Sequence, residues 1–307
     1  MKAGVIKAGV TKDRTKIPVK GGGQACPERS RRECPPHTPR GNTTVFLGGG
    51  RITGALLAGL HLAGYQRPII VHDRHPGKLR RLRREYGVSV EHVLYRAVEQ
   101  ADLLIIAVRP DAVSELLQQI KAFYSGSINP TIVVSLAAGI PLASLRGWLG
   151  KPMSWARAMP SPVARTGRGL TALTFAPNFP TAARRDVRNF FALVGAILEI
   201  PESKFDAFSV TYSSSQGYHA LAALSEAAQK IGLDRKTAIT ASAHALGDGI
   251  QAWRNGSISL DDLLQEAATP GGVAAATLAS MDKAGYARAV QKGLRAGLDR
   301  ARRYAKG

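Results

Sequence analysis

A glycine-rich turn between an apolar strand and an apolar helix constrains this chain more than any other feature of its sequence. The strand pattern covers residues 44–48, and an apolar helical pattern follows the glycines over 51–64. Glycine is needed at such a turn because side chains would keep backbone N–H groups away from a pyrophosphate at the helix N-terminus. The turn therefore predicts a nucleotide-binding first domain. Its candidate cofactor-binding residues are Leu47, Gly48, Gly49, Gly50, Arg51 and Ile52.

The glycine spacing departs from the dinucleotide-binding pattern at one position. Gly48 and Gly50 match it, but Thr53 occupies the third position and the next glycine comes one residue late. On this run alone, a glycine-rich turn without a ligand is the alternative. A second apolar strand ends at Asp73, 25 positions after Gly48, which is near the spacing at which a carboxylate meets an adenosine ribose.

Asp73 and its neighbours give opposite indications of the cofactor. A carboxylate at this position favours the free 2′-hydroxyl of NAD, whereas Arg74 and Lys78 suit the 2′-phosphate of NADP. Arg51 adds a third cation near the phosphates, so we expect NADP, with NAD as the alternative. An ordinary solvent-exposed turn is the non-functional interpretation of these residues.

Apolar strands alternate with helical patterns between residues 44 and 149. Continuous apolar strands between helices predict an α/β fold, a doubly wound, Rossmann-like parallel sheet covered on both faces. The ligand crevice of such a sheet lies beyond the carboxyl ends of its strands. The expected strands are 44–48, 68–72, 102–108 and 131–136, and the expected helices are 51–64, 76–86, 111–123 and 141–149.

The strand over 102–108 ends in a proline-containing segment at this same edge. The segment is expected to lie against the ribose or nicotinamide of the cofactor, and a plain strand terminator is the alternative. Its cofactor-binding candidates are Ala107, Val108, Arg109 and Pro110. A further β-α-β-like piece covers 154–200, within which we expect 157–162 to be a structural loop.

Alanine-rich helical patterns dominate after residue 203. Their small residues allow close helix approach, and the long final helices suit an oligomer interface. We therefore expect a dinucleotide-binding domain over 44–202 and an all-helical substrate and dimerisation domain over 203–307. The expected helices are 205–231, 234–254, 259–268, 273–284 and 286–304.

A basic N-terminal segment carries part of the net charge of +20. Residues 1–43 hold ten Lys or Arg against three Asp or Glu and show no hydrophobic period, so we expect a disordered tail. Both cysteines lie in it, which leaves no disulfide or thiolate metal site elsewhere. Basic and aromatic residues do not alternate in the way that is typical of nucleic-acid binding. No apolar run is long enough to span a bilayer. We expect a cytoplasmic protein without a membrane or nucleic-acid partner.

A Pro-Gly-Gly turn in the helical part is a candidate anion site. Exposed backbone N–H groups at the start of the next helix suit a small carboxylate, and a simple interhelical turn is the alternative. The candidate substrate-binding residues are Pro270, Gly271 and Gly272. Neither a catalytic triad nor a metal-ligand spacing is evident, so we expect no metal, which fits hydride chemistry carried by a cofactor.

Five motifs in order resemble those of the pyrroline-5-carboxylate reductase family, over about residues 44–304. The family's Gly-x-Gly-Asn-Met turn corresponds to 48–52, and its Ala-Val-Lys-Pro to 107–110. Its Val-Ser-x-Ala-Ala-Gly corresponds to 134–139, and its Arg-x-Met-Pro-Asn-Thr-Pro to 157–162. Its Ser-Pro-Gly-Gly-x-Thr corresponds to 269–274.

The resemblance implies an NADPH- or NADH-dependent reductase that forms proline. Hydride goes to the C=N carbon of 1-pyrroline-5-carboxylate, a cyclic imino acid, and the Pro-Gly-Gly amides hold its carboxylate. The candidate catalytic residues are Ser214 and Thr269. A homodimer or larger homo-oligomer is also implied, because the family's helical domain contacts a partner chain.

Three motifs depart from the family pattern. The Asn after Met-Pro is Ser161, and the Thr after Pro-Gly-Gly is Ala274, which removes a hydroxyl suited to the ring nitrogen. Losing one such hydrogen bond costs about 1–3 kcal/mol if its partner stays unsatisfied, and Thr269 is the candidate substitute. The alternatives are therefore a diverged reductase of another small imine or keto compound, or a non-catalytic nucleotide-binding regulator. The family's Ser-Gly-Ser-Gly-Pro-Ala-Tyr reads Tyr212-Ser213-Ser214-Ser215-Gln216-Gly217-Tyr218 here.

Overall fold

The computed structural model describes residues 43–123, 132–149 and 153–305. The tail expected to be disordered, residues 1–43, lies outside this part except for Thr43. Residues 40–307 form one compact unit, which contains every element described below. Among the described helices, none has the length and apolar character needed to cross a membrane.

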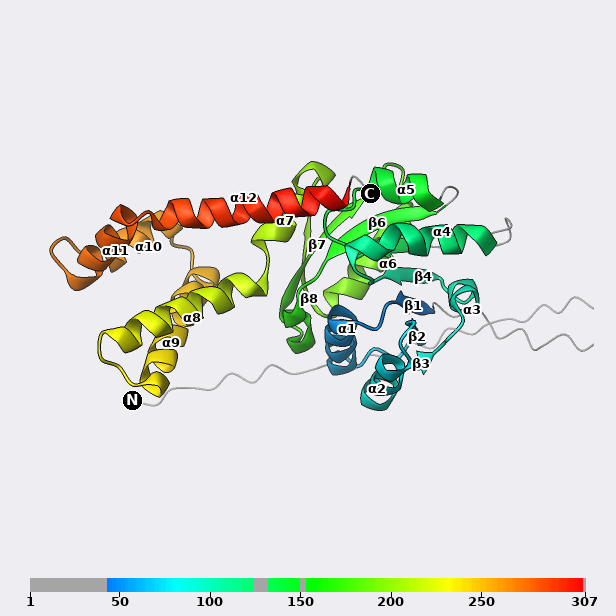
Figure 1. Ribbon diagram of the computed structural model, residues 1–307, viewed down its shortest axis with the longest axis horizontal. Coiled ribbons are helices and arrows are strands. Elements are labelled where there is room, and N and C mark those ends of the chain that lie inside the picture. Colours follow the sequence, from blue (N-terminus) through cyan, green and yellow to red (C-terminus); the bar gives the residue numbers. More distant parts are fainter. Residues whose placement is uncertain (1–42, 124–131, 150–152, 306–307) are drawn as a thin grey trace, which may run out of the picture. The chain divides into compact units, whose positions relative to one another are not determined.

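One sheet of eight strands organises the described part of the chain (Figure 1). Its strand order is β3-β2-β1-β4-β5-β6-β7-β8. β1 pairs in parallel with both β2 and β4, which makes the β1–β4 boundary the switch point of a doubly wound fold, as the sequence predicts. The strands are β1 (Thr44–Leu47), β2 (Ile69–His72), β3 (Ser89–Val90), β4 (Leu103–Ile106), β5 (Ile132–Ser135), β6 (Ser154–Met159), β7 (Gly169–Phe175) and β8 (Gly195–Glu199).

The strands expected between residues 44 and 136 pair in parallel, and one later pair of strands is antiparallel. β7 pairs with β6 antiparallel, and β8 then pairs with β7 in parallel. A short 3-10 helix, η2 (Pro162–Thr166), joins β6 to β7, and only antiparallel neighbours accept so short a connection. The expected loop over 157–162 is wrong as well, since Arg157 and Met159 are strand residues of β6.

Helices cover both faces of the sheet, as predicted. Phe46 of β1 belongs to a core with α1, α2 and α6, whereas Val45 and Leu47 belong to a core with α3, α4 and α5. Successive strand residues face opposite sides, so a sheet covered twice needs a continuous apolar run. The helices are α1 (Arg51–Leu62), α2 (Pro76–Tyr86), α3 (Leu94–Glu99), η1 (Pro110–Ala112), α4 (Val113–Phe123), α5 (Leu142–Leu149) and α6 (Thr181–Ala192).

The described chain after β8 is helical, with one break that the sequence analysis did not expect. The predicted helix over 205–231 is two helices, because Tyr212 leaves the helical conformation (φ −84°, ψ 72°). Ser213 then starts the next helix, where its side chain accepts a hydrogen bond from the Ser215 N–H. The helices are α7 (Glu202–Thr211), α8 (Ser214–Lys230), α9 (Arg235–Asn255), α10 (Leu260–Ala267), α11 (Val273–Lys283) and α12 (Tyr286–Tyr304).

The end of α12 packs on the turn after β5. Ala301 is buried, and a β-carbon at Gly139 would lie 2.0 Å from the Ala301 carbonyl oxygen. Gly139 also has φ +77°, a conformation that residues with a β-carbon rarely adopt. The turn therefore requires glycine for α12 to approach the sheet, and α12 in turn packs against α7.

Arg157 of β6 joins α7 to the sheet through a buried ion cluster. Its guanidinium is fully buried and contacts Glu202 at 2.9 Å and Asp206 at 2.7 Å. The same group lies 4.3 Å from the centre of the Phe205 ring, and Glu202 also accepts a hydrogen bond from the Leu142 N–H. In the sequence, Arg157 stands out only as part of a motif, and nothing near it predicts this cluster.

Candidate functional site

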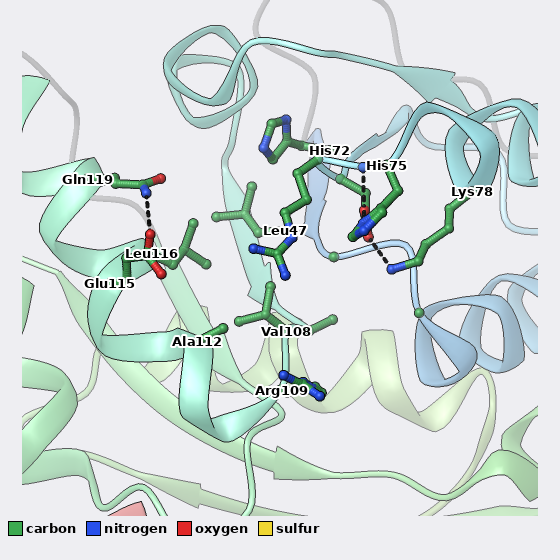
Figure 2. Close-up of a pocket in the computed structure, with 15 residues that line it drawn as sticks. Leu47, His72, His75, Lys78, Val108, Arg109, Ala112, Glu115, Leu116 and Gln119 are labelled. Atoms are coloured by element: carbon green, nitrogen blue, oxygen red, sulfur yellow. Dashed lines mark hydrogen bonds and ion pairs between the residues drawn. The ribbon is translucent and has the colours of Figure 1, made fainter. Parts of the chain in front are cut away.

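A pocket of about 430 Å³ opens at the carboxyl ends of β1, β2 and β4 (Figure 2). Leu47 and Gly48 line it from the end of β1, His72 from the end of β2, and Val108 from the segment after β4. In Figure 2 the fourth side of the pocket is α4, which contributes Glu115, Leu116 and Gln119. The pocket therefore lies at the switch point, where the sequence analysis expected the ligand crevice.

Gly48 is the residue that gives the turn its close approach to β4. Its φ is +114°, and a β-carbon there would lie 2.7 Å from the Ala107 carbonyl oxygen. Thr53, the residue that breaks the glycine spacing, donates a hydrogen bond of 2.5 Å from its hydroxyl to the Gly48 carbonyl. Thr53 is fully buried, so the threonine ties α1 to the turn instead of blocking a ligand.

Gly50 is the N-cap residue of α1 and supplies no side-chain hydrogen bond to the helix. The first N–H groups of a helix have no partner within it, and no acidic side chain occupies this first turn. The helix start therefore presents backbone donors and the positive end of the helix dipole without a covering side chain.

Asp73 is buried and its carboxylate turns toward the glycine turn. One oxygen, Oδ2, accepts hydrogen bonds from the Gly49 N–H at 2.8 Å and from Lys78 Nζ at 3.2 Å. The other, Oδ1, accepts from the His75 N–H at 2.8 Å and lies 2.9 Å from the His75 ring nitrogen Nδ1. Burial by itself raises the pKa of Asp73, but these hydrogen bonds outweigh it and lower the pKa to about 2. The group is therefore a carboxylate at neutral pH.

Three basic side chains surround the end of β2 and line the pocket. They are Arg74, which is exposed, and His75 and Lys78, whose side chains are about half exposed. Figure 2 shows His75 and Lys78 reaching toward the same carboxylate. The Asp73 carboxylate is thus a buried acidic group beside these three basic side chains, and this end of the pocket is basic.

Most of the predicted cofactor-binding residues meet at this pocket. Leu47, Gly48, Gly50, Asp73, Arg74, Ala107, Val108 and Arg109 line it. Gly49 is held by Asp73, while Arg51, Ile52 and Pro110 are not among the lining residues.

The contribution of η1, of α4 and of two histidines to the pocket was not predicted from the sequence. These lining residues are His72, His75, Ala112, Glu115, Leu116 and Gln119. The available signal was the helix that starts after Pro110, because a helix following the switch-point strand must cross the mouth of the crevice.

The predicted catalytic and substrate-binding residues lie on other elements. Ser214 begins α8, and Thr269 precedes the turn before α11, where its carbonyl accepts a hydrogen bond of 2.9 Å from the Gly272 N–H. Neither these two residues nor Pro270 and Gly271 line the pocket of the single chain described. Their roles stay predictions.

Two family models match the chain, one on each side of its middle. A model described as NADP oxidoreductase coenzyme F420-dependent covers residues 43–139. A model described as pyrroline-5-carboxylate reductase dimerisation covers residues 202–304.

Similar proteins include curated pyrroline-5-carboxylate reductases of several bacteria. One from Mycobacterium leprae is 32% identical over 207 residues, which cover 66% of this chain and 70% of the relative. The chain belongs to the pyrroline-5-carboxylate reductase family. The reductase of Mycobacterium tuberculosis is 29% identical over a match that covers 83% of this chain and 94% of the relative. That of Pseudomonas aeruginosa is 28% identical, and the match covers 86% of this chain and 96% of the relative.

Solved structures of family members share the fold. The Streptococcus pyogenes reductase superposes with a TM-score of 0.77 at 22% identity, covering 85% of this chain and 98% of its own. The Plasmodium falciparum reductase, solved with NADP bound, has a TM-score of 0.75 at 19% identity and covers 86% and 98%. The predicted fold class, a Rossmann-like sheet followed by helices, is confirmed.

Proposed function

We propose that this chain reduces 1-pyrroline-5-carboxylate to proline with NADPH. The observation that carries the proposal is the glycine turn at the start of α1, where no side chain caps the helix and three basic side chains lie nearby. The chain also belongs to the reductase family. When bound at this site, NADPH would supply the hydride for the imine carbon and would leave as NADP⁺. The π electron pair of the C=N bond would pass to the ring nitrogen, which keeps the proton that made the imine carbon electrophilic.

The glycine turn is the pyrophosphate site of the proposal. Gly48 lets the turn approach the Ala107 backbone, and Gly50, with open space beside it, leaves room for phosphate oxygens to reach backbone N–H groups at the start of α1. Asp73 supports this turn by holding the Gly49 N–H. Its oxygens already accept bonds from the protein, so we assign Asp73 to positioning the turn and not to binding an adenosine ribose.

The basic groups after β2 are the 2′-phosphate site of the proposal. Arg74 is exposed on the pocket wall, and Lys78 reaches the same corner from α2. A guanidinium and an ammonium suit a phosphate dianion, and the charge of Asp73 is offset by its own partners. NADP is therefore favoured over NAD.

The substrate carboxylate is assigned to the 269–272 turn of a second copy of the chain. The pocket of one copy is lined by residues of the sheet and its helices alone. Large apolar side chains are exposed on the later helices, Ile231 and Val273 at more than four-fifths of their surface, and Trp253 and Leu264 at about half. Such a surface indicates an interface between copies. The dimerisation model that matches 202–304 supports the same homo-oligomer and a helical domain beginning near residue 203.

The test of the proposal is proline formation by the purified protein with NADPH and NADH in parallel. Arg74→Ser is expected to raise KM for NADPH by roughly tenfold or more, since a charge-assisted hydrogen bond contributes about 1.5–3 kcal/mol, and to leave KM for NADH unchanged. Arg80→Ser, on the exposed face of α2 and outside the pocket, is the matched control. No turnover with either cofactor would contradict the function.

A second candidate, reduction of another small imine or keto compound, is favoured by residues that depart from the motifs of the family. Ala274 stands where the family has a threonine, and Ser161 where it has an asparagine. A panel of cyclic imines and 2-keto acids separates the two candidates, because kcat/KM is highest for the true substrate class.

A further inference from the structure

Two positions at which this chain departs from the family motifs meet in the structure. Ser161 stands for the family's Asn, and Tyr212 stands for the first Ser of its Ser-Gly-Ser-Gly run. They are 51 residues apart in the chain, yet the Ser161 hydroxyl and the Tyr212 hydroxyl lie 3.2 Å apart. The contact joins the segment after β6 to the break between α7 and α8.

Tyr212 sits at the break between α7 and α8. Its hydroxyl accepts a hydrogen bond of 2.7 Å from the Leu170 N–H at the start of β7, and its ring lies 5.3 Å from that of Phe208. The next residue, Ser213, is the N-cap of α8. The phenol therefore fastens the point at which the chain leaves α7 to the edge of the sheet, and a serine at this position is too short to reach it.

Ser161 is the partner on the other side of the contact. It is almost fully buried, follows β6, and begins η2 by accepting a hydrogen bond of 3.3 Å from the Val163 N–H. η2 packs along α1, the helix that starts at the glycine turn. An asparagine here would push two additional heavy atoms toward a phenol that already lies at hydrogen-bond distance.

We propose that Ser161 and Tyr212 are one positioning unit that sets the start of α8 relative to the cofactor helix α1. The contacts run from the α8 start through Tyr212 and Ser161 to η2 and α1. The unit rests on the proposed reductase function, since its role is to fix the position of the helical part, whose 269–272 turn is assigned to the pocket of a second copy. Neither side chain is assigned contact with substrate or cofactor.

A double-mutant cycle tests the unit in the full-length protein. The variants are Ser161→Ala, Tyr212→Phe and the pair together, with Tyr286→Phe, an exposed tyrosine of α12, as control. We expect each single variant to raise KM for the imine or lower kcat by about 5- to 30-fold, and the double variant to be no worse than Tyr212→Phe alone, because coupled sites are not additive. The dissociation constant for NADPH is expected to change less than about twofold, since no cofactor contact is removed.

A second pair of variants restores the family residues. Ser161→Asn and Tyr212→Ser are each expected to impair turnover, and the double variant to regain at least about a third of the wild-type kcat/KM, because the two changes compensate. If the fold-changes of the single variants multiply in the double variant of either cycle, the two residues act independently and the proposal is overturned. Loss of NADPH binding or of folding in Tyr212→Phe would indicate a merely structural role and would also overturn it. A wild type that does not reduce the imine overturns both this proposal and the proposed function, whereas an active wild type with independent variants overturns the unit alone.

Discussion

At the scale of single residues, Asp73 shows how one carboxylate on the pocket wall organises the glycine turn through hydrogen bonds to the protein. Its spacing from the glycines matches a ribose-binding acid, yet its oxygens hold Gly49, His75 and Lys78. The carboxylate thereby joins the end of β2 to the glycine turn and to α2. A residue in the expected place can thus serve the site indirectly.

Replacing Asp73 with asparagine is expected to lower the free energy of unfolding by about 2 kcal/mol at pH 7, the equivalent of a pKa lowered from 3.8 to about 2. Because the folded-state pKa lies below the unfolded value, the contribution is complete above pH 4 and is lost as the pH falls from about 4 to about 2. Urea unfolding of wild type and Asp73→Asn at pH 7, 4 and 3 measures the difference. Asp282→Asn, on exposed α11, is the control. A difference that grows as the pH falls would contradict the assignment.

At the scale of elements, the attachment of α7 depends on one buried cation. Arg157 has no exposed surface, and the carboxylates that neutralise it, Glu202 and Asp206, both come from α7. Its Nε and Glu202 Oε2 have no hydrogen-bond partner among the described protein atoms. Such a cluster specifies where α7 lies, while its net contribution to stability is reduced by the cost of burying the charges.

Replacing Arg157 with methionine leaves those two carboxylates without their partner. We expect a loss of about 3–5 kcal/mol in the free energy of unfolding, the usual effect of breaking a buried pair from one side. Adding Glu202→Gln and Asp206→Asn to the variant is expected to recover part of this loss. Urea unfolding reports the stability, and limited proteolysis at the α7–α8 junction reports whether α7 has detached. A loss below about 1 kcal/mol would show that the cluster is not the attachment.

At the scale of the whole molecule, the proposed site needs two copies of the chain. The pocket is formed by β1, β2, β4 and α4, whereas the proposed carboxylate site lies in the turn before α11. The exposed apolar side chains of α8 to α11 give the second copy a surface to bind. Under this proposal, the helical part serves both assembly and substrate binding.

Mixing two inactive variants tests this arrangement. Gly48→Val blocks the cofactor turn because its side chain meets the Ala107 carbonyl, and Gly271→Val disrupts a turn whose φ is +78°. In co-expressed protein, mixed dimers contain one intact site, so about a quarter of the wild-type specific activity is expected under random pairing. Each variant expressed alone is the control. A mixture as inactive as its components would show that each site is built within one copy.

The sequence alone determined the local order of this protein. The spacing of apolar residues and the positions of glycine and proline specify the central strands of the sheet, its helices and the switch-point turn. They do so because each of these signals depends only on residues a few positions apart. Gly48, Arg74 and Val108 could therefore be placed at one edge, with the order of the motifs indicating the family.

Contacts between distant residues decided the rest. The reversal of β7, the break at Tyr212 and the burial of Arg157 each depend on a partner 10 to 60 positions away. Asp73 is a further case, because its spacing from the glycines does not reveal the hydrogen bonds that it accepts from the Gly49 and His75 N–H groups. A residue pattern reports which side chains are available, but only the folded chain determines which of them are close enough to bond, because hydrogen bonds and ion pairs act over a few ångströms.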